Sequence, residues 1–203
     1  NQEAIKELSA DIEWRQSVLA YAKTTEDTKE TYTKLIKWSE RSGEKMSLFL
    51  VILSFVSPVI FVGVFIANFL LDIPFLGNLT GYLFLFNLMV VGSKLKIIKR
   101  EIDDATTINK TLKNYTLIIK QLEEKSFSSE KLNTLKNSLV DNNELASQQI
   151  KRLSALFAQL DNSTNLLAAT LFNGILLYNL HTLRSLYKWK AEHRTKTTAW
   201  LAI

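Results

Sequence analysis

Residues 46–93 read MSLFLVILSFVSPVIFVGVFIANFLLDIPFLGNLTGYLFLFNLMVVGS, and the only charge among them is that of Asp72. Asp72 divides the stretch into 26 uncharged residues, 46–71, and 21 uncharged residues, 73–93. A helix needs about 20 apolar residues to cross a hydrocarbon core of roughly 30 Å. The stretch therefore predicts a transmembrane helical hairpin with spans of about 46–71 and 76–93.

The two segments differ in how strongly they favour lipid. The first holds 18 Leu, Ile, Phe or Val residues, worth roughly −5 to −11 kcal/mol on the insertion scale. The centre of the second, residues 79–91, holds eight, worth roughly −2 to −5 kcal/mol, and Asn87 works against it. We therefore expect the second segment to insert as the return arm of a hairpin, after a turn at 72–80 that contains Pro74 and Gly77.

Basic residues flank the hairpin but are absent from its turn. Lys37, Arg41 and Lys45 precede it, and Lys94, Lys96, Lys99 and Arg100 follow it. The positive-inside rule then places both ends in the cytoplasm, which predicts an integral membrane protein with both soluble arms cytoplasmic. The alternative is a hydrophobic hairpin buried inside a soluble oligomer. It is less favoured, because 26 uncharged residues exceed an ordinary core helix.

Helix breakers are concentrated around the hairpin. Both prolines and five of the six glycines lie within residues 43–92, whereas the arms are rich in Leu, Lys, Glu and Ala, which favour helices. No segment alternates like a half-buried strand. The predicted fold class is all-α, a helical bundle with long antiparallel lever-like helices and an inserted hairpin. Residues 1–45 and 94–203 would form one cytoplasmic domain, and 46–93 the transmembrane hairpin.

Apolar spacing predicts the helices of the arms. One covers about residues 3–23, and another begins near Thr25 and runs toward Gly43. Residues 93–124 carry a narrow apolar stripe, suited to pairing with one other long helix. We expect its partner to be the helix before the hairpin, and the second span to continue into it.

Shorter helices are predicted toward the end of the chain. Residues 126–129, rich in serine, are expected to cap one that carries Leu132, Leu135 and Leu139, and a break follows at 141–143. Two further helices cover about 145–160 and 163–193. The apolar run Leu166–Leu180 is too short to span a membrane, so it predicts a buried core helix.

Residues typical of catalysis or metal binding do not cluster in this sequence. The absence of cysteine excludes disulfides and thiolate metal sites, and there is no glycine-rich phosphate loop. His181 and His193 lack a ligand pattern and are expected at a surface or core edge. The pairs Asp103–Asp104 and Glu123–Glu124 are adjacent, which is typical of solvated helix surface. We therefore expect no catalytic, cofactor-binding or metal-binding residues, and no enzyme activity from this chain alone.

Two basic clusters have competing interpretations. The cluster directly after the second span suits anionic lipid. The other comprises Arg184, Lys188, Lys190, Arg194 and Lys196. Stabilisation of a helix end is the favoured interpretation of this second cluster, and a phosphate-binding surface is the alternative.

Three stretches carry a recognisable combination of residues. The last comprises Asn173, Gly174, Ile175, Leu176, Leu177, Tyr178, Asn179, Leu180 and His181, followed by Leu186, Trp189, Lys190, Trp200 and Leu201. The other two are Glu7, Leu8, Trp14, Arg15 and Gln16, and Phe127, Ser128, Ser129, Leu132 and Leu135. Together they resemble the helical core of the MutS family of mismatch-repair ATPases, in particular a shortened, membrane-associated branch. That branch has an Asp where this chain has Asn179.

The resemblance implies a role for the chain within a larger machine. It would be the core and lever segment of a membrane-anchored MutS-like ATPase, with the hairpin where relatives insert their DNA clamp. The ATPase domain, with ATP and magnesium, would follow Ile203; it would also mediate a homodimer, and DNA would be a partner of the whole protein. The start at Asn1 and the apolar end at Trp200–Ile203 fit an excised piece. The alternative is a membrane-anchored helical scaffold or signalling module unrelated to DNA.

Overall fold

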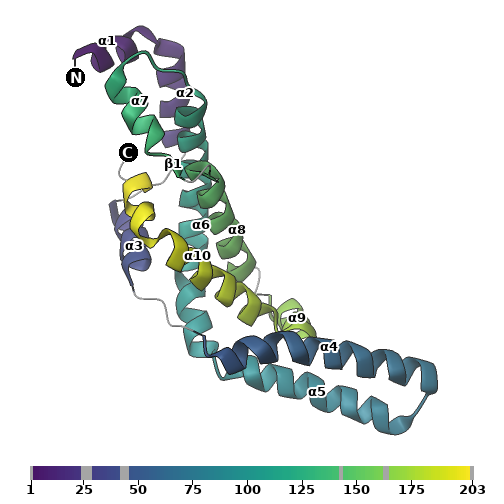
Figure 1. Ribbon diagram of the computed structural model, residues 1–203. Helices are drawn as coiled ribbons and strands as arrows, with labels where there is room; N and C mark the ends of the chain where they lie inside the picture. The colour runs from purple at the N-terminus through teal and green to yellow at the C-terminus, as the bar shows by residue number, and fades with distance from the viewer. Residues whose placement is uncertain (1, 24–28, 42–45, 142–143, 162–164, 202–203) are drawn as a thin grey trace. The chain divides into compact units, whose positions relative to one another are not determined.

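The computed structural model describes residues 2–23, 29–41, 46–141, 144–161 and 165–201 (Figure 1). Within these residues the regular secondary structure is helical, apart from the two-residue antiparallel pairing of β1 (Val140–Asp141) with β2 (Glu144–Leu145). The prediction of an all-α fold is confirmed. The chain divides into two units, one of residues 1–42, 106–157 and 192–203, the other of residues 43–105 and 158–191.

The first unit is an assembly of helices from three separate parts of the chain. It contains α1 (Gln2–Ala10), α2 (Ile12–Lys23), α3 (Lys29–Glu40), α7 (Glu130–Asn137), most of α8 (Ala146–Asp161), and parts of α6 (Leu95–Glu124) and α10 (Tyr178–Leu201). Its buried apolar residues recur at helical spacing and include Leu35, Trp38, Ile108, Leu112, Ile119, Ile150, Leu153 and Phe157. Trp38 of α3 meets Phe157 of α8 edge-on, with ring centroids 5.0 Å apart.

Within this unit, α6 and α8 run antiparallel. The Ser154 hydroxyl donates to the Asn109 side chain at 2.6 Å, and the Ser147 amide donates to the Glu123 carboxylate at 2.9 Å. The early part of α6 thus meets the later part of α8, and the end of α6 meets the beginning of α8. The expected pairing of α6 with the helix before the hairpin stays a prediction.

Asp11 divides the predicted first helix into α1 and α2. Its carboxylate accepts a hydrogen bond from the Trp14 amide at 3.1 Å, three residues further along. An Asp that accepts from an amide of the first turn is a favourable N-cap. The single helix expected over residues 3–23 is therefore wrong, because this local cap starts a new helix. The predicted helix start at Thr25 lies outside the described residues.

The second unit holds the hairpin, formed by α4 (Leu48–Leu71) and α5 (Pro74–Gly92). The Ser47 hydroxyl caps α4 by accepting from the Leu50 amide at 3.3 Å. At the other end, Asp72 adopts a left-handed conformation and its amide donates to the Asn68 carbonyl. The expected long turn at 72–80 is wrong, because α5 begins directly at Pro74, whose fixed φ suits a first helical position.

The second span does not continue into α6. Helix α5 ends at Gly92, and α6 begins at Leu95. The intervening turn is closed by the Lys94 amide, which donates to the Val91 carbonyl at 2.9 Å. The Ser93 hydroxyl also binds locally, to the Val90 carbonyl at 2.7 Å. Local bonds of this kind compete with the helical pattern, so the expected continuous helix is interrupted here.

A second break separates α9 (Leu166–Leu176) from α10, where one helix was expected over about residues 163–193. The two helices meet at 83°. Leu177 occupies the left-handed region at φ 51°, and its amide donates to the Asn173 carbonyl. The Asn173 side chain bridges the break, because it also accepts from the Asn179 amide at 2.9 Å.

One cluster of buried apolar residues in this unit lies at the end of the hairpin that is predicted to be cytoplasmic. Its members are Val90, Val91, Ile98, Leu177, Leu180 and Leu183. The end of α5 and the start of α6 thus share a core with the beginning of α10.

Candidate membrane-insertion site

The outer surface of the hairpin is apolar and exposed. Val59 on α4 is 73% exposed, Phe69 is 82% exposed, and Met89 on α5 is 69% exposed. Both helices are long and apolar enough to cross a membrane, and α9 with α10 would add a third span only as one bent segment. Monomeric soluble proteins rarely present an apolar patch of this extent to water. The outer surface of the hairpin therefore fits apolar surroundings better than water.

Three polar residues of the hairpin, Ser54, Ser57 and Asn87, are buried away from that surface. Ser57 and Asn87 are buried, with Asn87 fully inaccessible. The Ser57 hydroxyl donates to the Asn87 side-chain oxygen, and the Asn87 amide donates to the Gly174 carbonyl of α9 at 2.8 Å. Unsatisfied polar groups are costly in lipid. Asn87 is satisfied by partners on α4 and α9, which offsets its effect against insertion.

Pro58 creates a gap in the hydrogen bonding of α4. Proline has no N–H, so the Ser54 carbonyl four residues earlier loses its helical partner. His181 of α10 fills the gap, with its Nε2 2.8 Å from the Ser54 carbonyl oxygen. Because a carbonyl only accepts, this nitrogen carries the proton. His181 is half-buried and structural, in agreement with the predicted core-edge position.

Phe55 strengthens the same junction between α4 and α10. The His181 ring meets the Phe55 ring edge-on at 4.9 Å between centroids. The Arg184 guanidinium carbon lies 5.1 Å from the centroid of the Phe55 ring, a separation at which a cation is attracted to an aromatic face. Helix α4 therefore contacts α10 through the hydrogen bond of His181 to Ser54 and through the contacts of His181 and Arg184 with the Phe55 ring.

Gly174 lets α9 approach α5 closely. A Cβ atom at this position would come within 2.1 Å of the Phe84 ring. Any larger residue would force the ring or the helix to move. Small residues at close helix contacts are typical of packing between membrane helices.

The base of the hairpin carries the basic residues assigned to lipid headgroups. Lys96, Lys99 and Arg100 are exposed, and Lys94 is half-buried. Lys94 lines a small pocket of about 140 Å³ together with Ser47 and other residues of the second unit. This placement fits attraction to anionic headgroups, at about 1 kcal/mol per charge.

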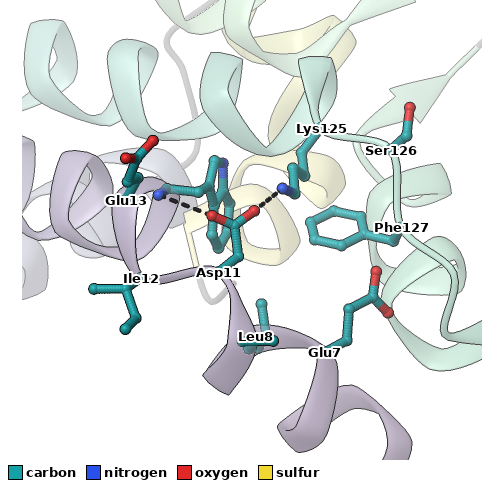
Figure 2. A pocket seen from close by; sticks show the side chains of 10 residues that line it. Glu7, Leu8, Asp11, Ile12, Glu13, Lys125, Ser126 and Phe127 are labelled. Atoms are coloured by element: carbon teal, nitrogen blue, oxygen red, sulfur yellow. Dashed lines mark hydrogen bonds and ion pairs between the residues drawn. The ribbon is translucent and has the colours of Figure 1, made fainter.

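A pocket lies in the first unit, where the chain around Asp11 meets residues 125–127 (Figure 2). Its volume is about 470 Å³. Figure 2 shows the Asp11 carboxylate directed at Lys125, with which it forms an ion pair. The hydrogen bond from Lys125, with a smaller contribution from the Trp14 amide, lowers the pKa of Asp11 below its ordinary value of 3.8. The Trp14 ring meets Phe127 edge-on, with centroids 5.8 Å apart.

Glu7, on the rim of the same pocket, caps α7. Its two carboxylate oxygens accept from the amides of Ser128 and Ser129, each at 2.7 Å. Ser129 is the N-cap residue of α7, within the predicted range 126–129, but its side chain makes no cap bond and the Glu7 carboxylate accepts from its amide instead. A carboxylate is well suited to the positive end of a helix. The charged groups Glu7, Asp11 and Lys125 are therefore used to join two distant parts of the chain.

Two other polar side chains, Glu123 and His193, differ from their predicted roles. Glu123 is not simply solvated surface, since its carboxylate binds both the amide and the hydroxyl of Ser147 at the start of α8. His193 is buried, 3.8 Å from the Glu144 carboxylate, and its ring centroid lies 5.7 Å from that of Trp200. The side chains of Asp103 and Asp104 lie outside the described residues.

The basic residues of α10 do not form one exposed surface. Lys190 is only 5% exposed, and Arg194 donates to the Glu40 carbonyl at 2.8 Å. Arg184 lies against Phe55, in the interior of α10 and not at its end. These contacts give the residues separate packing roles, which neither predicted interpretation anticipated.

Comparison with known proteins returned no matching family model, curated protein or solved structure. Among the described residues, no three His, Cys, Asp or Glu side chains are grouped so as to hold a metal ion. The functional feature that the geometry defines best is the hairpin, with apolar residues outside and satisfied polar residues inside.

Proposed function

We propose that this chain is a membrane-anchored helical module, inserted in a lipid bilayer by the hairpin α4–α5, with both soluble arms on the cytoplasmic side. One observation carries the proposal: exposed side chains of the hairpin such as Val59 and Phe69 are apolar, while Ser57 and Asn87 bond to each other inside. This distribution suits lipid, where backbone and polar groups must be satisfied internally. The cytoplasmic orientation is supported by the basic residues on both flanks of the hairpin.

A charge in the middle of α4 tests the anchor. Ile60 is 47% exposed near the centre of this helix, and an arginine there costs about 2.5–3.5 kcal/mol at mid-bilayer. We expect Ile60→Arg to weaken the partition constant for lipid vesicles by about 60- to 300-fold. Ile5→Arg is the matched control, because Ile5 is 66% exposed on α1 of the other unit.

The proposed membrane anchor would be contradicted if Ile60→Arg had no larger effect than Ile5→Arg. Equal partition constants for the two variants, with the unaltered chain monodisperse in buffer without detergent, would show that protein covers the hairpin. The hairpin would then be the core of a soluble oligomer.

We further propose that the helices outside the hairpin are the core and levers of a MutS-like ATPase, in which they couple a downstream ATPase domain to the membrane. The three resembling stretches support this assignment. Two of them are in direct contact, through the bonds from Ser128 and Ser129 to Glu7 and the contact of Trp14 with Phe127. ATP and magnesium would bind in the downstream domain, and a packed helix pair can transmit motion between two discrete states.

The sequence that follows Ile203 in the parent gene tests this assignment directly. A glycine-rich phosphate loop ending in Gly-Lys-Ser or Gly-Lys-Thr is expected there. An unrelated domain would remove the MutS assignment and favour a membrane-anchored scaffold or signalling module. Under this assignment the hairpin, between α3 and α6, would stand where MutS proteins insert a DNA clamp, so we expect no clamp-type DNA contact. A strong duplex affinity of this chain in detergent that falls steeply with salt would contradict that expectation.

A further inference from the structure

Helix α9 has its polarity reversed relative to a helix of a soluble core. Its buried residues are Asn173 and Gly174, a polar and a small residue. Its leucines point outward: Leu166 is 78% exposed, Leu167 is 79% exposed and Leu171 is 57% exposed. The expectation of a buried core helix over Leu166–Leu180 is therefore wrong for α9, whereas Leu177 and Leu180 at the break and after it are buried. In water such a helix would turn its leucines inward.

The inner face of α9 is fixed against the hairpin itself. The Gly174 carbonyl accepts a hydrogen bond from the Asn87 side-chain amide, and the Phe84 ring packs where a Cβ atom of residue 174 would lie. Phe84 and Asn87 lie eight and five residues before Gly92, the last residue of α5, so they are about 12 and 8 Å from that end of the span. Helix α9 is thus attached to a part of α5 that lies inside the hydrocarbon layer when the hairpin spans it.

The length of α9 and the break after it suit a segment that enters the layer without crossing it. Eleven helical residues extend about 16 Å, roughly half of the 30 Å hydrocarbon core. At Leu177 the chain turns by 83° into α10. The break leaves few polar groups unpaired, because Asn173 accepts from the Asn179 amide and donates to the Ala169 carbonyl.

We propose that α9 is embedded in the lipid beside the hairpin, as a third membrane segment that does not span the bilayer. Acyl chains contact its outer face at Leu166, Leu167, Leu171 and Phe172, which continues the lipid-facing surface of α4 and α5. The Thr170 hydroxyl donates to the Leu166 carbonyl within the helix, so this polar group of α9 has a partner when acyl chains surround the helix. The inference rests on the proposed membrane anchor. It adds to that anchor a helix, α9, which at 11 residues is too short to span the bilayer.

Single cysteines can test the environment of α9, because the chain contains no cysteine of its own. In the full chain reconstituted into liposomes, Leu171→Cys and Leu167→Cys would each carry a nitroxide spin label. Oxygen, which concentrates in lipid, and a water-soluble nickel chelate, which is excluded from it, would then compete for collisions with the label. Val59→Cys on α4 is the lipid control, and Lys113→Cys, exposed on α6, is the aqueous control.

We expect both α9 labels to give the oxygen-to-nickel ratio of the Val59 label, several-fold above that of the Lys113 label. A lipid-type ratio at Val59 with an aqueous ratio at Leu171 and Leu167 would overturn the inference and leave the anchor intact. Low access of both reagents to the α9 labels would also overturn it, because protein would then cover this face. An aqueous ratio at Val59 would instead reject the anchor itself. Each cysteine replaces an exposed side chain, and circular dichroism of the labelled proteins verifies that they fold.

Discussion

The hydrogen bond from His181 to the carbonyl that Pro58 leaves without a partner can be measured by a double-mutant cycle. His181→Phe removes the donor but keeps an aromatic ring beside Phe55. Pro58→Ala restores an N–H four residues after Ser54, so that the Ser54 carbonyl regains its helical partner. If the histidine is present to fill that gap, its removal should matter only while the proline is there.

The expected coupling follows from the geometry. The bond is 2.8 Å long, and hydrogen bonds between membrane helices average about 0.6 kcal/mol with a maximum near 1.7 kcal/mol. A buried carbonyl left unsatisfied costs about 1–3 kcal/mol. We therefore expect His181→Phe to lower the free energy of unfolding by about 1–2 kcal/mol in the natural background. In the Pro58→Ala background the loss should be close to zero, which gives a coupling of about 1 kcal/mol or more.

The assay is equilibrium unfolding of all four proteins in mixed detergent micelles, followed by far-UV circular dichroism as the fraction of denaturing detergent rises. The direct effect of Pro58→Ala on helix stability cancels in the cycle. Independent sites are additive within about 0.3–0.5 kcal/mol. A loss for His181→Phe that is the same in both backgrounds within that margin would refute the reasoning.

Two further predictions test other contacts, the close packing at Gly174 and the ion pair of Asp11. Gly174→Ala and Gly63→Ala both gain about 0.8–1 kcal/mol of helix propensity, but only the Cβ at 174 would meet Phe84, at 2.1 Å, whereas nothing lies within 4 Å of the one at 63. In the same unfolding assay we expect Gly174→Ala to lower the free energy of unfolding by about 1–3 kcal/mol through overpacking. Gly63→Ala should leave this free energy unchanged or raise it. Equal gains in the two variants would argue against close packing at Gly174. The pKa of Asp11 is lowered by Lys125, so its contribution to stability is present above about pH 4 and is lost as the pH falls through the lowered value. Asp11→Asn should therefore flatten the fall in Tm below about pH 4, and parallel acid limbs for the two proteins would exclude a contribution from this pair.

The sequence predicted best those helices whose hydrophobic pattern extends over many residues. The hairpin follows from two uncharged runs on either side of Asp72, and the observed helices differ from the predicted spans by at most two residues at each end. The stripe after the hairpin likewise predicted α6. Such patterns involve many residues, so no single contact elsewhere in the fold changes their outcome.

The breaks were missed because each depends on one or two side chains. Asp11 three residues before Trp14 is an N-cap signal that could have been found. No comparable sequence signal marks the left-handed conformation of Leu177. The Leu177 amide donates to the Asn173 carbonyl and the Leu177 side chain is buried, and both contacts are visible only in the fold. Contacts between distant residues were also beyond reach. Pro58 marks an orphaned carbonyl, but only the fold reveals that His181 supplies the donor.

The cap that Glu7 places on α7 constrains when the first unit can fold during synthesis. Its partners Ser128 and Ser129 lie 121 and 122 residues further along the chain. At about 5–20 residues per second, the ribosome needs roughly 6 to 24 s to synthesise the chain between them. The hydrophobic hairpin is made during that interval, while α1 still lacks its partner. The hairpin is therefore synthesised before the first unit can close, and under the proposed anchor the first unit would be completed on a chain already held at the membrane.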